Sequence, residues 1–172
     1  LEDGSVRMEI ATIPSIPFSG AFAFVTDYGH FCTEQLSARA MYLLYARSFL
    51  LESEQRLAEE TLPDILRNIL SRQLPNGGFA YWPGYSDAHP WVTSMAGEVM
   101  VEARRQGFAI DRKAVDRWVS CQKTAARDYR HTTVCAADLI QAYRLYTLAL
   151  AGEQPSAAMN RLRAVSYTHL TL

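Results

Sequence analysis

Apolar side chains recur at helical spacing almost without interruption from Thr33 to the end of the chain. Residues 33–51 show the pattern first, with Leu36, Leu43 and Leu44 on one face of a helix. The same period returns over residues 62–73, 90–106, 112–122 and 133–151, and Ser156 can begin one more short helix. Loops rich in glycine, proline or polar residues separate these segments. The pattern predicts an all-α fold from Thr33 onward.

The helical pattern also contains a weak repeat. Residues 69–73 (Ile-Leu-Ser-Arg-Gln) close one predicted helix, and residues 118–122 (Trp-Val-Ser-Cys-Gln) close another. Each is followed by a loop and then by a long apolar helix. Repeated helix pairs stack into a solenoid or close into a ring, and this chain is long enough for only part of a ring. Trp82, Trp91 and Trp118 are expected as core aromatics.

Length and charge exclude several classes of protein. The chain has 172 residues, of which 49% are hydrophobic and 20% charged, which suits one globular domain. The net charge of −1 gives no basic footprint for nucleic acid or an anionic membrane. The apolar runs are far shorter than the roughly 20 residues of a membrane span. No metal or cofactor is expected, because CxxC spacing is absent from the three cysteines, Cys32, Cys121 and Cys135.

The two ends of the chain differ from the middle. Val6, Met8 and Ile10 alternate with charged residues, as in a half-buried strand, and prolines follow. Residues 1–27 are therefore interpreted as a short β or irregular segment, the end of a preceding β domain and a linker. Residues 164–172 turn rich in Ser, Thr and Tyr and are predicted to be a non-native tail. Residues 28–163 remain as the helical domain, in a chain that we expect to be a fragment.

The sequence Cys32-Thr33-Glu34-Gln35 stands where the first helix begins. Residues three apart share a face in the first turn of a helix, so the thiol of Cys32 can meet the carboxamide of Gln35. Attack of the sulfur on the amide carbon with loss of ammonia would give an internal thioester. Helix N-termini favour thiolates, and they also favour an acid such as Glu34.

Three stretches together resemble a known family. The Cys32–Gln35 motif follows a turn that contains Tyr28, Gln73 leads into a glycine-rich loop ending at Trp82, and residues 89–94 (His-Pro-Trp-Val-Thr-Ser) open the next helix. This combination resembles the thioester domain of the alpha-2-macroglobulin and complement family, most closely its bacterial branch. The resemblance implies an alpha/alpha toroid of helix hairpins, present here as a partial ring.

The resemblance also implies a function. In this family a protease cleaves a bait region elsewhere in the protein, the thioester is exposed, and a nucleophile such as lysine on the protease becomes covalently attached. The chain would then belong to a bacterial endopeptidase inhibitor, a single-use trap and not an enzyme. Its expected partners are target proteases and other domains of the same larger protein. Its expected location is secreted, periplasmic or anchored at the cell surface.

The family pattern assigns roles to individual residues. Cys32 would supply the sulfur and Gln35 the acyl group, with Glu34 as the supporting acid. Gly29 and Phe31 stand where the family usually has proline and glycine. By its position before the fifth predicted helix, His131 resembles the histidine that shifts the target from amines to hydroxyls in some members. The aromatic residues expected to wall a dry pocket are Tyr28, Phe31, Tyr81 and Trp82.

Other functions remain open on the sequence. The same fold without a thioester would act through protein–protein contacts alone. Cys32 could instead serve a thiol hydrolase with His131 or His30 as base. Asp87 and Glu98 could be read as a glycosidase pair, because alpha/alpha toroids also host glycosidases, but fold analogy alone confers no function.

Overall fold

The computed structural model describes residues 20, 22, 25, 31–131 and 136–169. The helices follow one another along this part of the chain in the order α2 (Thr33–Ala46), the 3-10 turn η1 (Arg47–Phe49), α3 (Glu52–Leu70), α4 (Pro90–Arg105), α5 (Arg112–Asp128), α6 (Ala137–Leu150) and α7 (Ser156–His169). The predicted all-α class is confirmed over these residues. The β segment expected within residues 1–27 falls almost wholly outside them.

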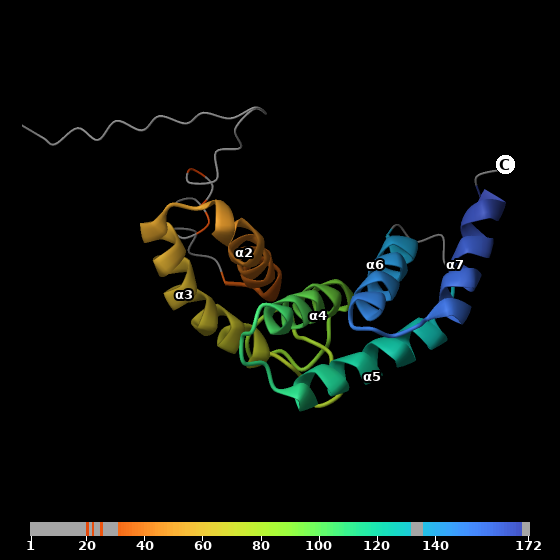
Figure 1. Cartoon of the computed structure of the whole chain (residues 1–172). Coiled ribbons are helices and arrows are strands. Elements are labelled where there is room, and N and C mark those ends of the chain that lie inside the picture. The colour runs from red at the N-terminus through yellow and green to blue at the C-terminus, as the bar shows by residue number, and fades with distance from the viewer. Residues whose placement is uncertain (1–19, 21, 23–24, 26–30, 132–135, 170–172) are drawn as a thin grey trace, which may run out of the picture.

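The helices form three hairpins along a curved arc (Figure 1). α2 pairs with α3, α4 with α5, and α6 with α7. α2, α4 and α6 also pack against one another in series along the inner side of the arc, while α3, α5 and α7 lie on its outer side. This is the arrangement of stacked helix pairs that the repeat predicted. Closure into a ring stays a prediction.

α4 and α5 approach each other closely at one point. The indole of Trp118 is fully buried, and its Nε1–H donates to the backbone oxygen of Thr93 at 2.8 Å. Gly97 faces this ring so closely that an added Cβ would lie 1.9 Å from the indole atom Cε2. The absence of a side chain at Gly97 therefore allows a large aromatic ring to fill the space between α4 and α5.

The loop from α3 to α4 is held by backbone bonds of β type. Gln73 bridges to Phe79, and Ala80 bridges to Ala88. Gly77 has a φ of 88°, and a Cβ there would lie 2.1 Å from the backbone oxygen of Arg117 in α5. Glycine is thus required both by the backbone conformation and by the close contact. The loop is fixed against the helical layer and can hold side chains in place.

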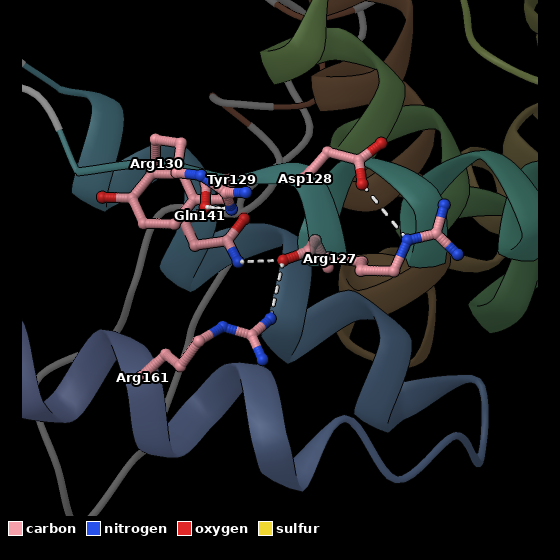
Figure 2. Close-up of polar contacts among 7 residues, drawn as sticks. Arg127, Asp128, Tyr129, Arg130, Gln141 and Arg161 are labelled. Carbon is pink, nitrogen blue, oxygen red and sulfur yellow. Dashed lines mark hydrogen bonds and ion pairs between the residues drawn. The ribbon is translucent and has the colours of Figure 1, made fainter.

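The last hairpin is attached to the end of α5. Figure 2 shows the side chains of Gln141, from α6, and Arg161, from α7, reaching the same carbonyl oxygen. This oxygen belongs to Ala126, and the two nitrogen–oxygen distances are 3.2 and 3.4 Å. Because the last carbonyls of a helix have no partner within the helix, both contacts satisfy an acceptor that would otherwise depend on water.

Two predicted helix boundaries are wrong. α3 begins at Glu52 and not at residue 62, because Glu54 accepts from the backbone of Leu51 at 2.9 Å and caps this earlier start. Pro63 lies inside α3, where the carbonyl that loses its partner belongs to the exposed residue Glu59. α5 continues to Asp128 through residues 123–128, which contain neither glycine nor proline.

α7 begins at Ser156 as expected and extends to His169, further than the short helix that was predicted. None of the helices in the described part of the chain has the length and apolarity needed to cross a membrane.

Stability should depend on pH through Tyr143, which connects α6 to α4. Its hydroxyl donates to Glu98 Oε2 at 2.5 Å, and burial followed by this hydrogen bond raises the pKa of Tyr143 above its usual value near 10. A raised folded-state pKa leaves the stabilisation intact below about pH 10 and removes it as pH rises further, because only the unfolded chain then loses the proton. We expect the melting temperature to fall between pH 9 and 11, and to fall less steeply in Tyr143→Phe. Equal slopes, with the exposed Tyr85→Phe as control, would contradict this role.

Candidate functional site

The N-terminus of α2 brings Cys32 and Gln35 together. Cys32 is the N-cap residue, and its sulfur accepts from the backbone N–H of Gln35 at 3.4 Å. In return, Oε1 of Gln35 accepts from the backbone N–H of Cys32 at 3.3 Å. This reciprocal pair is a capping box, with cysteine where serine or threonine usually stands. The carboxamide is therefore folded back onto the residue that carries the thiol, and Cys32 is only 3% exposed.

Glu34 is held by two aromatic side chains from other parts of the fold. The hydroxyl of Tyr81 donates to Oε2 at 2.6 Å, and Nε1–H of Trp91 donates to Oε1 at 3.1 Å. Both carboxylate oxygens are thus used. The hydrogen bond to Glu34, then burial, then the side chain of Cys32 raise the pKa of Tyr81, so the phenol stays protonated at neutral pH.

Thr33 attaches this helix start to the glycine-rich loop. Its backbone N–H donates to the oxygen of Tyr81 at 2.9 Å, and its hydroxyl donates to the oxygen of Ala80 at 2.6 Å. The guanidinium of Arg72 in turn donates to Oγ1 of Thr33 at 3.3 Å. Arg72 and Thr33 are both buried. Four segments of sequence therefore meet at the first turn of α2.

Arg72 is an unusual neighbour for this site. Among the described residues no carboxylate lies within ion-pair distance of it, so its charge is buried beside a neutral hydroxyl. Burial lowers the pKa of Arg72, and the Cys32 side chain acts in the opposite direction. A buried cation without an ion-pair partner favours a negative charge nearby, and a thiolate released at Cys32 would supply one.

The expected pocket walls are only partly where they were predicted. Phe31 is 51% exposed and Trp82 is 41% exposed, so neither is a buried wall, and Trp82 is not a core aromatic. Trp82 lies beside Tyr81, with ring centroids 5.8 Å apart. Tyr28 is outside the described residues. The aromatic contacts to the motif come instead from the half-buried Tyr81 and Trp91, on the loop and the first turn of α4.

The other candidate residues have partners of their own. His131 Nδ1 lies 3.1 Å from Asp138 Oδ1, and the role of His131 in shifting the target from amines to hydroxyls remains a prediction. Glu98 accepts from Tyr143, which leaves little support for a glycosidase pair with Asp87. His30 and Cys135 lie outside the described residues. Within the described ranges, no three histidine, cysteine or acidic side chains gather as a metal site would require.

Sequence reasoning missed three parts of this site. Trp91 was expected only as packing, yet it donates to Glu34, and Tyr81 was expected only as a wall. Arg72 was passed over as part of a repeat. The sequence held no local signal for Arg72, because Ser71 and Gln73 on either side are polar too and arginine is ordinarily exposed.

Comparison with known proteins gives one family. No family model matches the chain. An alpha-2-macroglobulin of Xylella fastidiosa is 29% identical over 125 residues, which are 66% of this chain and 8% of that protein. One of Rickettsia conorii is 28% identical over 115 residues, or 63% of this chain and 6% of that protein.

Solved structures agree. The native alpha-2-macroglobulin of Escherichia coli, from domain MG7 to the C-terminus, superposes with a TM-score of 0.74 at 19% identity, over 87% of this chain and 25% of that one. The resemblance to bacterial alpha-2-macroglobulins is confirmed. Salmonella alpha-2-macroglobulin reacted with methylamine superposes with a TM-score of 0.73 at 20% identity, over 87% of this chain and 11% of that one. At these identities the superpositions establish the fold, and the chain spans less than a tenth of the length of the two alpha-2-macroglobulin sequences.

Proposed function

We propose that this chain carries an internal thioester between Cys32 and Gln35, and that it captures attacking proteases for a larger, alpha-2-macroglobulin-like protein. The observation that carries the proposal is the capping box, in which each of the two residues hydrogen bonds the other. The larger protein would work as a single-use inhibitor outside the cytoplasm, in the periplasm or at the cell surface.

The arrangement suits formation of the bond. The sulfur of Cys32 attacks Cδ of Gln35, the carbon–nitrogen bond breaks, and the nitrogen leaves as ammonia. Negative charge develops on Oε1 during the attack, and the backbone N–H of Cys32 already donates to this oxygen. Such a preorganised donor stabilises the tetrahedral intermediate.

Capture uses the same carbon as the electrophile a second time. An amine attacks Cδ, the carbon–sulfur bond breaks, and Cys32 is released as a thiol while the attacker remains bound as an amide. Lysine has a pKa of about 10.4, so only a small fraction is neutral at pH 7. A protease held nearby offsets this through its high effective concentration, and Arg72 would favour the departing thiolate.

Mass spectrometry under denaturing conditions without reductant tests the proposal. We expect the chain to be about 17 Da lighter than its sequence, the mass of the ammonia lost in acyl transfer. Incubation with methylamine should add one methylamine and release one thiol. If the chain instead has the full mass of its sequence and the Cys32 thiol reacts with a thiol reagent before methylamine is added, no thioester is present. The fold would then act through protein–protein contacts alone.

The same samples separate the thiol-hydrolase alternative. A hydrolase would turn over a small ester repeatedly, and Cys32→Ala would abolish this turnover. A trap reacts once for each chain, so the amount of ester cleaved should not exceed one equivalent per chain.

A further inference from the structure

One side chain, that of Trp91, contacts both the first turn of α2 and the helix α6 of the third hairpin. Building on the thioester proposed above, we propose that Trp91 is a positioning residue for its formation. It holds Glu34, and with it the first turn of α2, in the form in which Cys32 and Gln35 react. It also makes this form depend on the packing of α6. Trp91 acts through Glu34 and not on the reacting atoms.

The first support is the contact between Trp91 and Glu34. The indole Nε1–H donates to Glu34 Oε1 at 3.1 Å, and the hydroxyl of Tyr81 donates to the other carboxylate oxygen at 2.6 Å. Glu34 stands in sequence between the two residues of the capping box, at a helix end, where a helix frays most readily. A carboxylate held at both oxygens, from the loop and from α4, therefore limits the movement of the whole first turn.

The second support is the contact between Trp91 and α6. The indole lies beside the ring of Tyr143, with centroids 4.9 Å apart and planes inclined by 45°. Tyr143 is fixed in turn, because its hydroxyl donates to Glu98 Oε2 at 2.5 Å. Glu98 lies about two turns further along α4 than Trp91. The indole ring is thus packed against α6 while its N–H reaches α2, so that all three hairpins contribute to one contact.

This anchoring bears on the reaction because the capping box alone holds the reacting groups weakly. The hydrogen bond from the backbone of Cys32 to Gln35 Oε1 is 3.3 Å long, against a usual value of about 2.9 Å, and sulfur is a weak acceptor. During formation the sulfur bonds to Cδ, the carbon–nitrogen bond breaks, and the nitrogen leaves as ammonia with the thiol proton. The rate of such a step depends steeply on how well the two groups are aligned.

The test measures how fast the thioester forms. Treatment with ammonia returns the thioester to Cys32 and Gln35, because ammonia attacks Cδ and releases the sulfur as a thiol. The chain is then unfolded in denaturant and refolded by dilution without ammonia, and its folded fraction is sampled for the species about 17 Da lighter. Trp91→Phe keeps an aromatic ring and removes the N–H. We expect it to form the thioester about tenfold more slowly, the effect of losing one hydrogen bond to a charged group.

Trp118→Phe is the matched control. It also removes one indole N–H, the donor to the backbone oxygen of Thr93, and leaves the contact with Glu34 in place. Because Trp118 is fully buried, this variant should lower the melting temperature, yet it should form the thioester at the wild-type rate. Trp91→Phe should instead slow formation with little change in melting temperature. A role in stability alone would give the opposite order.

Two further substitutions test the two ends of the contact, and they serve also if Trp91→Phe does not fold. In a Glu34→Ala background, Trp91→Phe should slow formation no further, because the N–H then has no carboxylate to hold. Glu34→Ala alone should be slow. Tyr143→Leu removes the ring beside Trp91 and should slow formation, whereas Tyr143→Phe keeps the ring and should form the thioester at the wild-type rate.

The outcomes are distinct. If the wild type never shows the lighter species, the proposed function fails, and the role of Trp91 fails with it. If the wild type is lighter as purified but does not regain the thioester on refolding, the lighter fraction of freshly expressed protein replaces the rate, with the same order of variants expected.

The role of Trp91 is overturned, while the thioester stands, if Trp91→Phe forms the bond as fast as the wild type. Equal slowing in Trp118→Phe, or slowing by Trp91→Phe that persists in the Glu34→Ala background, would also overturn it. Formation at the wild-type rate in Tyr143→Leu would overturn the dependence on α6.

Discussion

Gly97→Ala is expected to destabilise the fold by about 3 kcal/mol, at the upper end of the usual cost of overpacking. The added Cβ would lie 1.9 to 2.2 Å from three atoms of the Trp118 indole, and this ring is anchored by its bond to Thr93. Alanine gains about 1 kcal/mol over glycine as a helix former. The clash exceeds this gain, because neither α4 nor the ring can move without disturbing the core. Chemical denaturation monitored by circular dichroism measures the loss.

The control removes the part of the Trp118 ring that the new Cβ would meet. The three atoms that the new Cβ would meet are Cε2, Cζ2 and Nε1 of the indole, and phenylalanine lacks this part of the ring system. Gly97→Ala should therefore cost much less in a Trp118→Phe background than in the wild type. Gly97→Ala with unchanged or higher stability would show that α4 and α5 do not pack as described.

Cys32→Ser is expected to abolish the thioester completely while leaving folding intact or improved. Serine is a preferred N-cap residue, and its oxygen can accept the N–H of Gln35 in place of the sulfur. The expected gain in stability is up to about 1 kcal/mol. The mass should equal that of the sequence, and methylamine should not be incorporated.

Gln35→Glu provides the complementary change. Glutamate completes a capping box as well as glutamine does, and a carboxylate suits the first turn of a helix. It offers no ammonia to expel, so we expect normal melting and no acyl transfer. If either variant kept the mass that is about 17 Da lower, residues other than Cys32 and Gln35 would have to form the bond. Loss of folding in both would show that the capping geometry is more demanding than the hydrogen bonds indicate.

Local patterns predicted most of the helices but not all their ends. The helix predicted from residue 112 does begin there, and the side chain of Asp111 just before it accepts from the backbone N–H of Lys113. The start of α3 was missed because the Thr61–Asp64 spacing imitates a cap, whereas Thr61 in fact donates to the oxygen of Leu57 within the helix. Two competing local signals of similar strength cannot be ranked without the tertiary contacts.

The candidate site divides in the same way. The pairing of Cys32 with Gln35 follows from a spacing of three residues, and the sequence was sufficient to predict it. The contacts of Glu34 with Tyr81 and Trp91 join residues 47 and 57 positions apart. Such contacts depend on how the hairpins stack, and helical periodicity carries no information on which aromatic side chain will meet which acid. The exposure of Trp82 likewise depends on how the hairpins stack, and the helical periodicity does not predict it.

The bonds from Thr33 to the carbonyls of Ala80 and Tyr81 have a consequence for timing. These acceptors are synthesised 47 and 48 residues after Thr33, so an emerging chain holds the thiol and the carboxamide long before the loop that orders them exists. The reactive bond would then be made late, once the first hairpin and the loop are assembled. A chain stalled before Ala80 should keep an unmodified Cys32, which would prevent the early exposure of an acyl group to water.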